Sequence, residues 1–150
     1  MEAFAIRFPI PSHFLQAHAL RSNWKGSMKG RVPAGNIKLK RAYDTPAPED
    51  GMRILVDRLW PRGLSKQRAA INQWMKDISP STKLRQWFGH DPSRWDEFRR
   101  RYATEVHQYP ELLDQLRSLA RKGPITLVYS ASDEVHNDAV ALRHVILGRG

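Results

Sequence analysis

The order of the predicted elements indicates an α/β fold: a small, mostly parallel sheet flanked by helices in a three-layer, Rossmann-like arrangement. Short β-branched and aliphatic runs mark strands, and longer stretches with apolar residues at spacings of three and four mark helices. The two kinds of segment follow one another in an orderly pattern from residue 36 onward. At 150 residues, the chain has the length of a single such domain.

The first 36 residues differ from the rest of the chain. They carry five basic residues and one acid, three prolines and no sustained hydrophobic period, which favours a disordered extension. One alternative is a targeting segment, although Arg7, Pro9 and Pro11 interrupt its apolar runs. Another is that translation starts at Met28. We therefore expect residues 37–150 to form the single α/β domain.

Three segments are predicted as strands. "NIKLKRAY" (residues 36–43) alternates apolar and basic residues, as a strand with one exposed face does. "MRILVDRL" and "ITLVYSA" contain the continuous apolar runs of buried parallel strands. If residues 53–59 and 124–130 are parallel neighbours, the loops after them emerge at one edge of the sheet. Open α/β sheets bind ligands at that edge.

Four segments are predicted as helices. A short helix begins after Ser79 or Ser81 and ends at Gly89. A second begins with Asp91 as its cap, and a third begins at Pro110. The last covers "SDEVHNDAVALRHVILG", with a buried stripe formed by Val135, Ala139, Leu142 and Ile146.

Composition limits the classes of function. With 25 basic and 15 acidic residues the net charge is +10, which favours anionic partners, either small molecules or nucleic acid. Beyond residue 36 the excess is +6 and is spread out, apart from the run Arg99–Arg101. The absence of cysteine excludes disulfides, thiolate nucleophiles and Cys-ligated metals, and no metal or cofactor is predicted. No stretch approaches the ~20 apolar residues of a membrane span, so we expect a cytoplasmic protein without membrane contact.

The loop after the second strand, "DRLWPRGLSK" (residues 57–66), is rich in cations and contains Trp60. A guanidinium group offers a rigid fork of donors that matches phosphate or carboxylate. With an arginine of the short helix, the loop predicts binding residues for an anionic ligand: Arg58, Trp60, Arg62, Lys66 and Arg85. The alternative is that Arg58 pairs with Asp57 or Glu105 while the tryptophan closes the end of the sheet.

The loop after the last strand, "YSASDEVHNDA", is expected to open the last helix. A helix N-terminus attracts anions through its dipole and its unpaired N–H groups, which predicts Tyr129, Ser130 and Asn137 as further binding residues. Asp133 and His136, expected in the first helical turn, are candidates for acid–base catalysis. The alternative is that Ser132 or Asp133 is an ordinary cap and His136 a surface residue.

Several blocks of the sequence, taken together, resemble a known family. "KRAYD", "GMRILVDRLWPRGLSK", "KDISPSTKLRQWF" and "TLVYSASDEVHNDAVALRHVI" are similar to the YeaO-like branch of the bacterial domain-of-unknown-function 488 family, over about residues 37–146. The resemblance implies a small cytosolic α/β protein and no particular activity. Some branches carry cysteines near the last strand–helix loop, and their thiol chemistry does not transfer to this cysteine-free chain.

Three functions stay open at this point. The first is binding of a small phosphate- or carboxylate-bearing ligand at the carboxyl edge of the sheet, with or without catalysis. The second is nucleic-acid binding through Lys38, Lys40 and Arg99–Arg101. The third is a structural or partner-binding module in which the site arginines form a buried arginine–carboxylate network. The sequence predicts neither the ligand nor the oligomeric state.

Overall fold

The computed structural model describes residues 30–149. The chain divides into two compact units, and every element named below belongs to the second, Val32–Gly150. Residues 1–29 of the predicted extension, with the alternative start at Met28, lie outside the described residues. Within the described part of the chain, no helix is long and apolar enough to cross a membrane.

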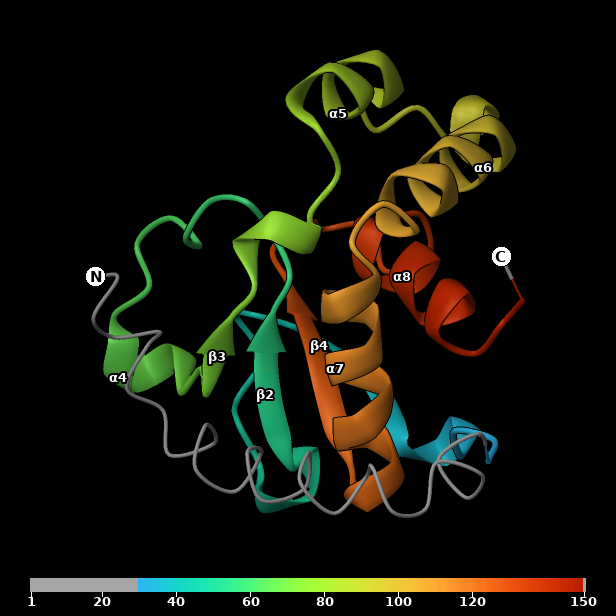
Figure 1. The fold of residues 1–150 in the computed structure, drawn as a ribbon. Coiled ribbons are helices and arrows are strands. Elements are labelled where there is room, and N and C mark those ends of the chain that lie inside the picture. The colour runs from blue at the N-terminus through green and yellow to red at the C-terminus, as the bar shows by residue number, and fades with distance from the viewer. Residues whose placement is uncertain (1–29, 150) are drawn as a thin grey trace. The chain divides into compact units, whose positions relative to one another are not determined.

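The described residues form one four-stranded parallel sheet in the order β1-β4-β2-β3 (Figure 1). At its centre, Leu127 lies opposite Leu39 on one side and Ile54 on the other. The α/β class and the parallel pairing of the second and last predicted strands are confirmed. A short additional strand, β3, was not predicted and extends the sheet beyond β2. The strands are β1 (Ile37–Arg41), β2 (Met52–Leu55), β3 (Gln73–Trp74) and β4 (Ile125–Tyr129).

The helices connect these strands and extend beyond the sheet (Figure 1). The predicted short helix is confirmed, with the Ser81 hydroxyl accepting the Leu84 N–H and Gly89 ending the helix at positive φ. Asp91 caps a 3₁₀ turn that leads into the predicted long helix. The α-helices are α4 (Lys66–Ala69), α5 (Thr82–Phe88), α6 (Trp95–Val106), α7 (Pro110–Lys122) and α8 (Asp138–Ile146). The 3₁₀ turns are Ala34–Asn36, Pro48–Asp50, Lys76–Ile78 and Pro92–Arg94.

The two faces of the sheet are covered differently. On one face α8 packs against β1 and β4, and α6 and α7 contact α8. On the other face Leu55 and Val128 lie in a smaller cluster with Ala42, Ala69 and Ile71. Of the elements on this face, α4 contributes Ala69 to the cluster. Partly buried side chains complete it: Trp60, Leu64 and Trp74.

The last helix begins later than predicted. Its cap is Asn137, whose Oδ1 accepts the N–H of Val140 at 2.9 Å. The prediction that Asp133 and His136 lie in its first turn is therefore wrong, because both precede the cap. Val135 is 61% exposed and does not join the buried stripe, whereas the other members do: Ala139, Leu142 and Ile146.

Candidate functional site

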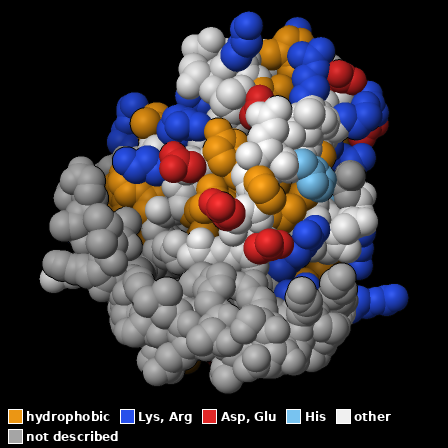
Figure 2. Space-filling model, in the orientation of Figure 1, with side chains coloured by type: hydrophobic (Ala, Val, Ile, Leu, Met, Phe, Trp, Pro, Cys, Tyr) orange, Lys and Arg blue, Asp and Glu red, His pale blue; other side chains and the backbone are white. Residues whose placement is uncertain are grey.

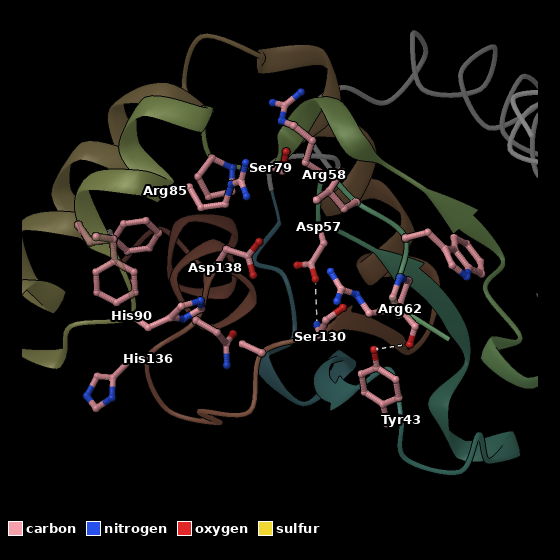
Figure 3. Close-up of a pocket in the computed structure, with 18 residues that line it drawn as sticks. Tyr43, Asp57, Arg58, Arg62, Ser79, Arg85, His90, Ser130, His136 and Asp138 are labelled. Atoms are coloured by element: carbon pink, nitrogen blue, oxygen red, sulfur yellow. Dashed lines mark hydrogen bonds between the residues drawn. The ribbon is translucent and has the colours of Figure 1, made fainter. Parts of the chain in front are cut away.

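The loops after three strands meet at the carboxyl edge of the sheet. Asp57 follows β2 and Ser130 follows β4, and the backbone N–H of Ser130 donates to Asp57 Oδ2 at 2.9 Å. Tyr43 follows β1, and its hydroxyl donates to the Arg62 carbonyl at 2.9 Å (Figure 3). Because parallel neighbouring strands end at the same edge, the two loops predicted to come together do so.

A cavity of about 360 Å³ lies over this edge, within the size range of small-molecule sites (Figure 3). These loops supply most of its wall, and the rest comes from α5 with the residues flanking it, from α6 and from the start of α8. Its polar lining comprises Tyr43, Asp57, Arg58, Arg62, Ser79, Arg85, His90, Ser130, His136, Asn137 and Asp138. Its apolar lining comprises Leu59, Trp60, Pro61, Pro80, Phe88, Phe98 and Ala131.

Seven of the ten predicted site residues line this cavity, namely Arg58, Trp60, Arg62, Arg85, Ser130, His136 and Asn137. The other three do not. Lys66 is the exposed first residue of α4, and Tyr129 is 3% exposed within β4. Asp133 lies in the loop before α8, outside the lining. Asn137 lines the cavity but has a structural role, since its side chain caps α8 and donates to the Asp133 carbonyl.

The three arginines of the cavity come from two separate segments. Arg58 and Arg62 belong to the loop after β2, and Arg85 belongs to α5. None of the three guanidinium groups forms an ion pair with a carboxylate of the described residues. The Nε of Arg58 is buried without a hydrogen-bond partner among the same residues.

The predicted pairing of Arg58 with Asp57 or Glu105 is not found among the described contacts. Asp57 accepts the backbone N–H of Ser130 instead. Glu105 accepts both the N–H and the hydroxyl of Ser81, at 2.8 and 2.7 Å. Glu105 thus fixes the start of α5, the helix that carries the site's third arginine.

Trp60 packs at the end of the sheet and also lines the cavity. Its ring meets Trp74 edge-on, with centroids 5.4 Å apart, and packs against the smaller core cluster. Its Nε1 donates to the Leu64 carbonyl at 2.6 Å. Trp60 therefore closes this end of the sheet and also forms part of the cavity wall.

Asp133 and His136 form a local pair. Asp133 accepts the N–H groups of Val135 and His136, and its Oδ2 lies 2.9 Å from His136 Nδ1. The hydrogen bond from the Val135 N–H, followed by those from His136, lowers the pKa of Asp133 to about 2. A carboxylate with so low a pKa is a weak base, and its contact with Nδ1 holds the imidazole ring. The ring also packs edge-on against Trp95.

Sequence reasoning missed a pair of carboxyl groups in the cavity. Asp57, after β2, and Asp138, the first residue of α8, both line the cavity, and their carboxyl groups face each other in Figure 3. Burial, followed by the charge of Asp57, raises the pKa of Asp138 well above its ordinary value. The burial and the neighbouring charge both favour the protonated form of Asp138. Asp57 follows a predicted strand, but no signal in the sequence places Asp138 beside it.

This raised pKa predicts a pH-dependent stability. The folded protein keeps a proton on Asp138 that the unfolded chain releases near pH 4, so stability falls as pH rises from about 4 toward the folded-state pKa. We expect the difference in Tm between Asp138→Asn and the wild type to grow in favour of the variant as pH rises from about 4 to about 8. Each kcal/mol of free energy of unfolding corresponds to about 4 °C in Tm. Melting curves at several pH values measure this. The exposed Asp114→Asn variant on α7 is the control. A Tm difference that does not change with pH would contradict the assignment.

The cations considered for nucleic-acid binding have partners within the protein. Arg99 pairs with Asp96, while Arg100 and Arg101 pair with Glu97. On the face shown in Figure 2, lysine and arginine side chains are dispersed and acidic side chains lie between them. Two lysines of β1 are engaged as well: Lys38 donates to the Glu49 carbonyl and Lys40 pairs with Asp50.

The cavity holds no histidine–carboxylate cluster suited to a metal. Among residues 30–149, no group of three or more His, Cys, Asp or Glu side chains could hold an ion. The site is therefore defined by three arginines, a carboxyl pair, hydroxyl groups and aromatic walls.

These features define a small α/β protein with a cavity of mixed charge at the carboxyl edge of a parallel sheet. The chain belongs to the DUF488-N3 family, since the model described as "Inactive DUF488-N3 subclade" matches residues 36–149. It is 44% identical to the uncharacterized protein YeaO of Escherichia coli over 107 residues, which are 71% of this chain and 93% of YeaO. It is 37% identical to the uncharacterized protein Rv3073c of Mycobacterium tuberculosis over 113 residues, 75% of this chain and 95% of that protein. No solved structure gives a significant match.

Proposed function

We propose that this protein binds a small anionic ligand in the cavity at the carboxyl edge of the sheet, through Arg58, Arg62 and Arg85. The observation that carries the proposal is that the three arginines line one cavity without a recorded carboxylate partner among the described residues. A guanidinium group can bind phosphate or carboxylate through two parallel hydrogen bonds, which suits a ligand of either kind.

The buried Nε of Arg58 supports the same proposal. A buried donor without an acceptor costs about 1–3 kcal/mol, and native proteins keep few of them. A ligand oxygen that accepts from this group, after a movement of the Arg58 side chain that exposes it, removes that cost. The description of the matching subclade as inactive favours binding without catalysis, and the low pKa of Asp133 agrees with a positioning role for that residue.

The test is a thermal-shift and calorimetric screen against phosphate, sulfate, nucleotides and dicarboxylates. A ligand present at about 100 times its Kd stabilises the protein by about 2.7 kcal/mol. We expect Arg85→Ala to weaken binding at least tenfold, since it removes a charge-assisted contact. Lys83→Ala removes a positive charge from the exposed part of the same helix and should leave the affinity within about twofold.

Two outcomes would contradict the proposal. One is the absence of any shift with all the anions tested. The other is equal binding by the Arg85→Ala and Lys83→Ala variants. Steeply salt-dependent binding of DNA or RNA, unchanged by Arg85→Ala, would support the nucleic-acid alternative instead.

A further inference from the structure

The cavity presents both signs of charge to whatever occupies it. Arg58, Arg62 and Arg85 line it together with Asp57 and Asp138. A ligand that is only anionic pairs with the arginines but brings a negative charge toward the carboxyl pair. A ligand that is only cationic pairs with the carboxyl groups but brings a positive charge toward the arginines. Charge complementarity within one cavity therefore favours a ligand that carries both charges.

The carboxyl pair is well placed to receive the cationic end. Asp57 is held by the Ser130 N–H at 2.9 Å, and Asp138 is the first residue of α8. Both carboxyl groups are thus fixed at the ends of regular elements, and they face each other in the cavity (Figure 3). An ammonium group has three donors and no acceptor, so it can donate to both carboxylates at once.

The size of the cavity limits the ligand further. About 360 Å³ lies near the lower end of the range for small-molecule sites. Phe88 and Phe98 belong to the lining and give the cavity an apolar part of its wall. A short hydrocarbon chain suits that wall.

We propose that the ligand is a small zwitterion, in which an anionic group binds the three arginines and a primary ammonium group binds the Asp57–Asp138 pair. This inference rests on the proposed function, because it assigns the second end of the same ligand. It assigns the chemical class of the ligand and leaves open whether the anionic group is a carboxylate or a phosphate.

Matched pairs of probes test the inference by isothermal titration calorimetry. One pair is 4-aminobutyrate and butyrate, and the other is phosphoethanolamine and ethyl phosphate. In each pair only the ammonium group differs. We expect the aminated member of at least one pair to bind at least tenfold more tightly to the wild-type protein.

The variants assign that preference to the carboxyl pair. Asp138→Asn should reduce the preference to about threefold or less, whereas the exposed Asp114→Asn on α7 should keep it. If Asp138→Asn does not fold, Asp57→Asn provides the same test from the other carboxyl group.

The outcomes separate the two proposals. If both members of each pair bind the wild type equally and neither binds the Arg85→Ala variant, the zwitterion proposal is overturned and the anion site stands. Ethylamine binding as tightly as the aminated probes would also overturn it, because the arginines would then contribute nothing. If none of these probes binds, and no anion in the earlier screen binds either, the proposed function itself is overturned.

Discussion

Gly51→Ala is expected to destabilise the protein by several kcal/mol. Gly51 has φ 63° and ψ −136°, a conformation that side-chain-bearing residues rarely adopt. Holding alanine there costs about 1–3 kcal/mol. A Cβ at this position would also lie 2.8 Å from the carbonyl carbon of Pro124 and still closer to its oxygen. Both atoms belong to the backbone, so the start of β2 or of β4 must move, which adds about 1–3 kcal/mol.

Urea denaturation measures this loss, and Gly123→Ala is the matched control. Gly123 has an extended backbone, and no atom lies within 4 Å of a Cβ built on it. We expect the control to change the free energy of unfolding by less than about 1 kcal/mol. Equal stability of the two variants would show that the close approach to Pro124 does not constrain the sheet. Folded Gly51→Ala protein should still bind ligand, since Gly51 lies outside the cavity lining.

The position of the site was predictable from the sequence for a geometric reason. Two apolar runs, each followed by polar residues unsuited to a core, predict buried parallel strands with functional loops at one edge. The register of β2 and β4 places the two loops side by side, and the Ser130–Asp57 hydrogen bond joins them. Arg85 was identified because its helix has clear start and stop signals at Ser81 and Gly89.

The start of the last helix was not predictable in the same way. Ser132, Asp133 and Asn137 are all good cap residues, and local sequence does not rank them. Asp133 instead closes a tight turn with the N–H groups that follow it, which leaves Asn137 to cap α8. That shift of the helix start places Asp138 in the cavity, so the carboxyl pair could be found only in three dimensions.

The short strand β3 and the location of Lys66 were missed for a related reason. Two residues, Gln73 and Trp74, are too few to show a strand period, and they pair with β2 through tertiary contact. Lys66 follows the cap Ser65 and so begins a helix that leads away from the cavity lining. Sequence spacing alone placed it with the arginines of the same loop.

The buried arginine–carboxylate network considered for the site arginines exists, but other residues form it. Arg53, 3% exposed, donates to Asp50 Oδ2 at 2.8 Å and to the Ala69 carbonyl at 2.8 and 3.2 Å. Lys40 also pairs with Asp50. Asp50 precedes β2 and Arg53 lies within it, so the network is displaced toward the amino end of that strand. The arginines at the carboxyl edge do not belong to this network.

Arg53→Met is therefore expected to destabilise the protein by about 3–5 kcal/mol, the usual cost of removing one member of a buried ion pair. The substitution leaves Asp50 with a single cationic partner and deprives the Ala69 carbonyl of its two donors. Burial alone would raise the pKa of Asp50, but hydrogen bonds from the Ala47 N–H, Lys40 and Arg53 lower it below its ordinary value. The carboxylate thus stabilises the fold above about pH 4, and this contribution is lost as pH falls through the folded-state pKa.

Urea denaturation at pH 7 measures the effect, with the exposed Arg68→Met on α4 and Arg62→Met in the cavity as controls. Both controls should stay within about 0.5 kcal/mol of the wild type. The double variant Asp50→Asn/Arg53→Met should be less destabilised than the sum of its single changes, because removing both charges leaves neither unpaired. Strictly additive changes would show that Arg53 acts through packing alone. If Arg62→Met were as destabilising as Arg53→Met, the carboxyl-edge arginines would belong to the architecture, and the case for a ligand there would fail.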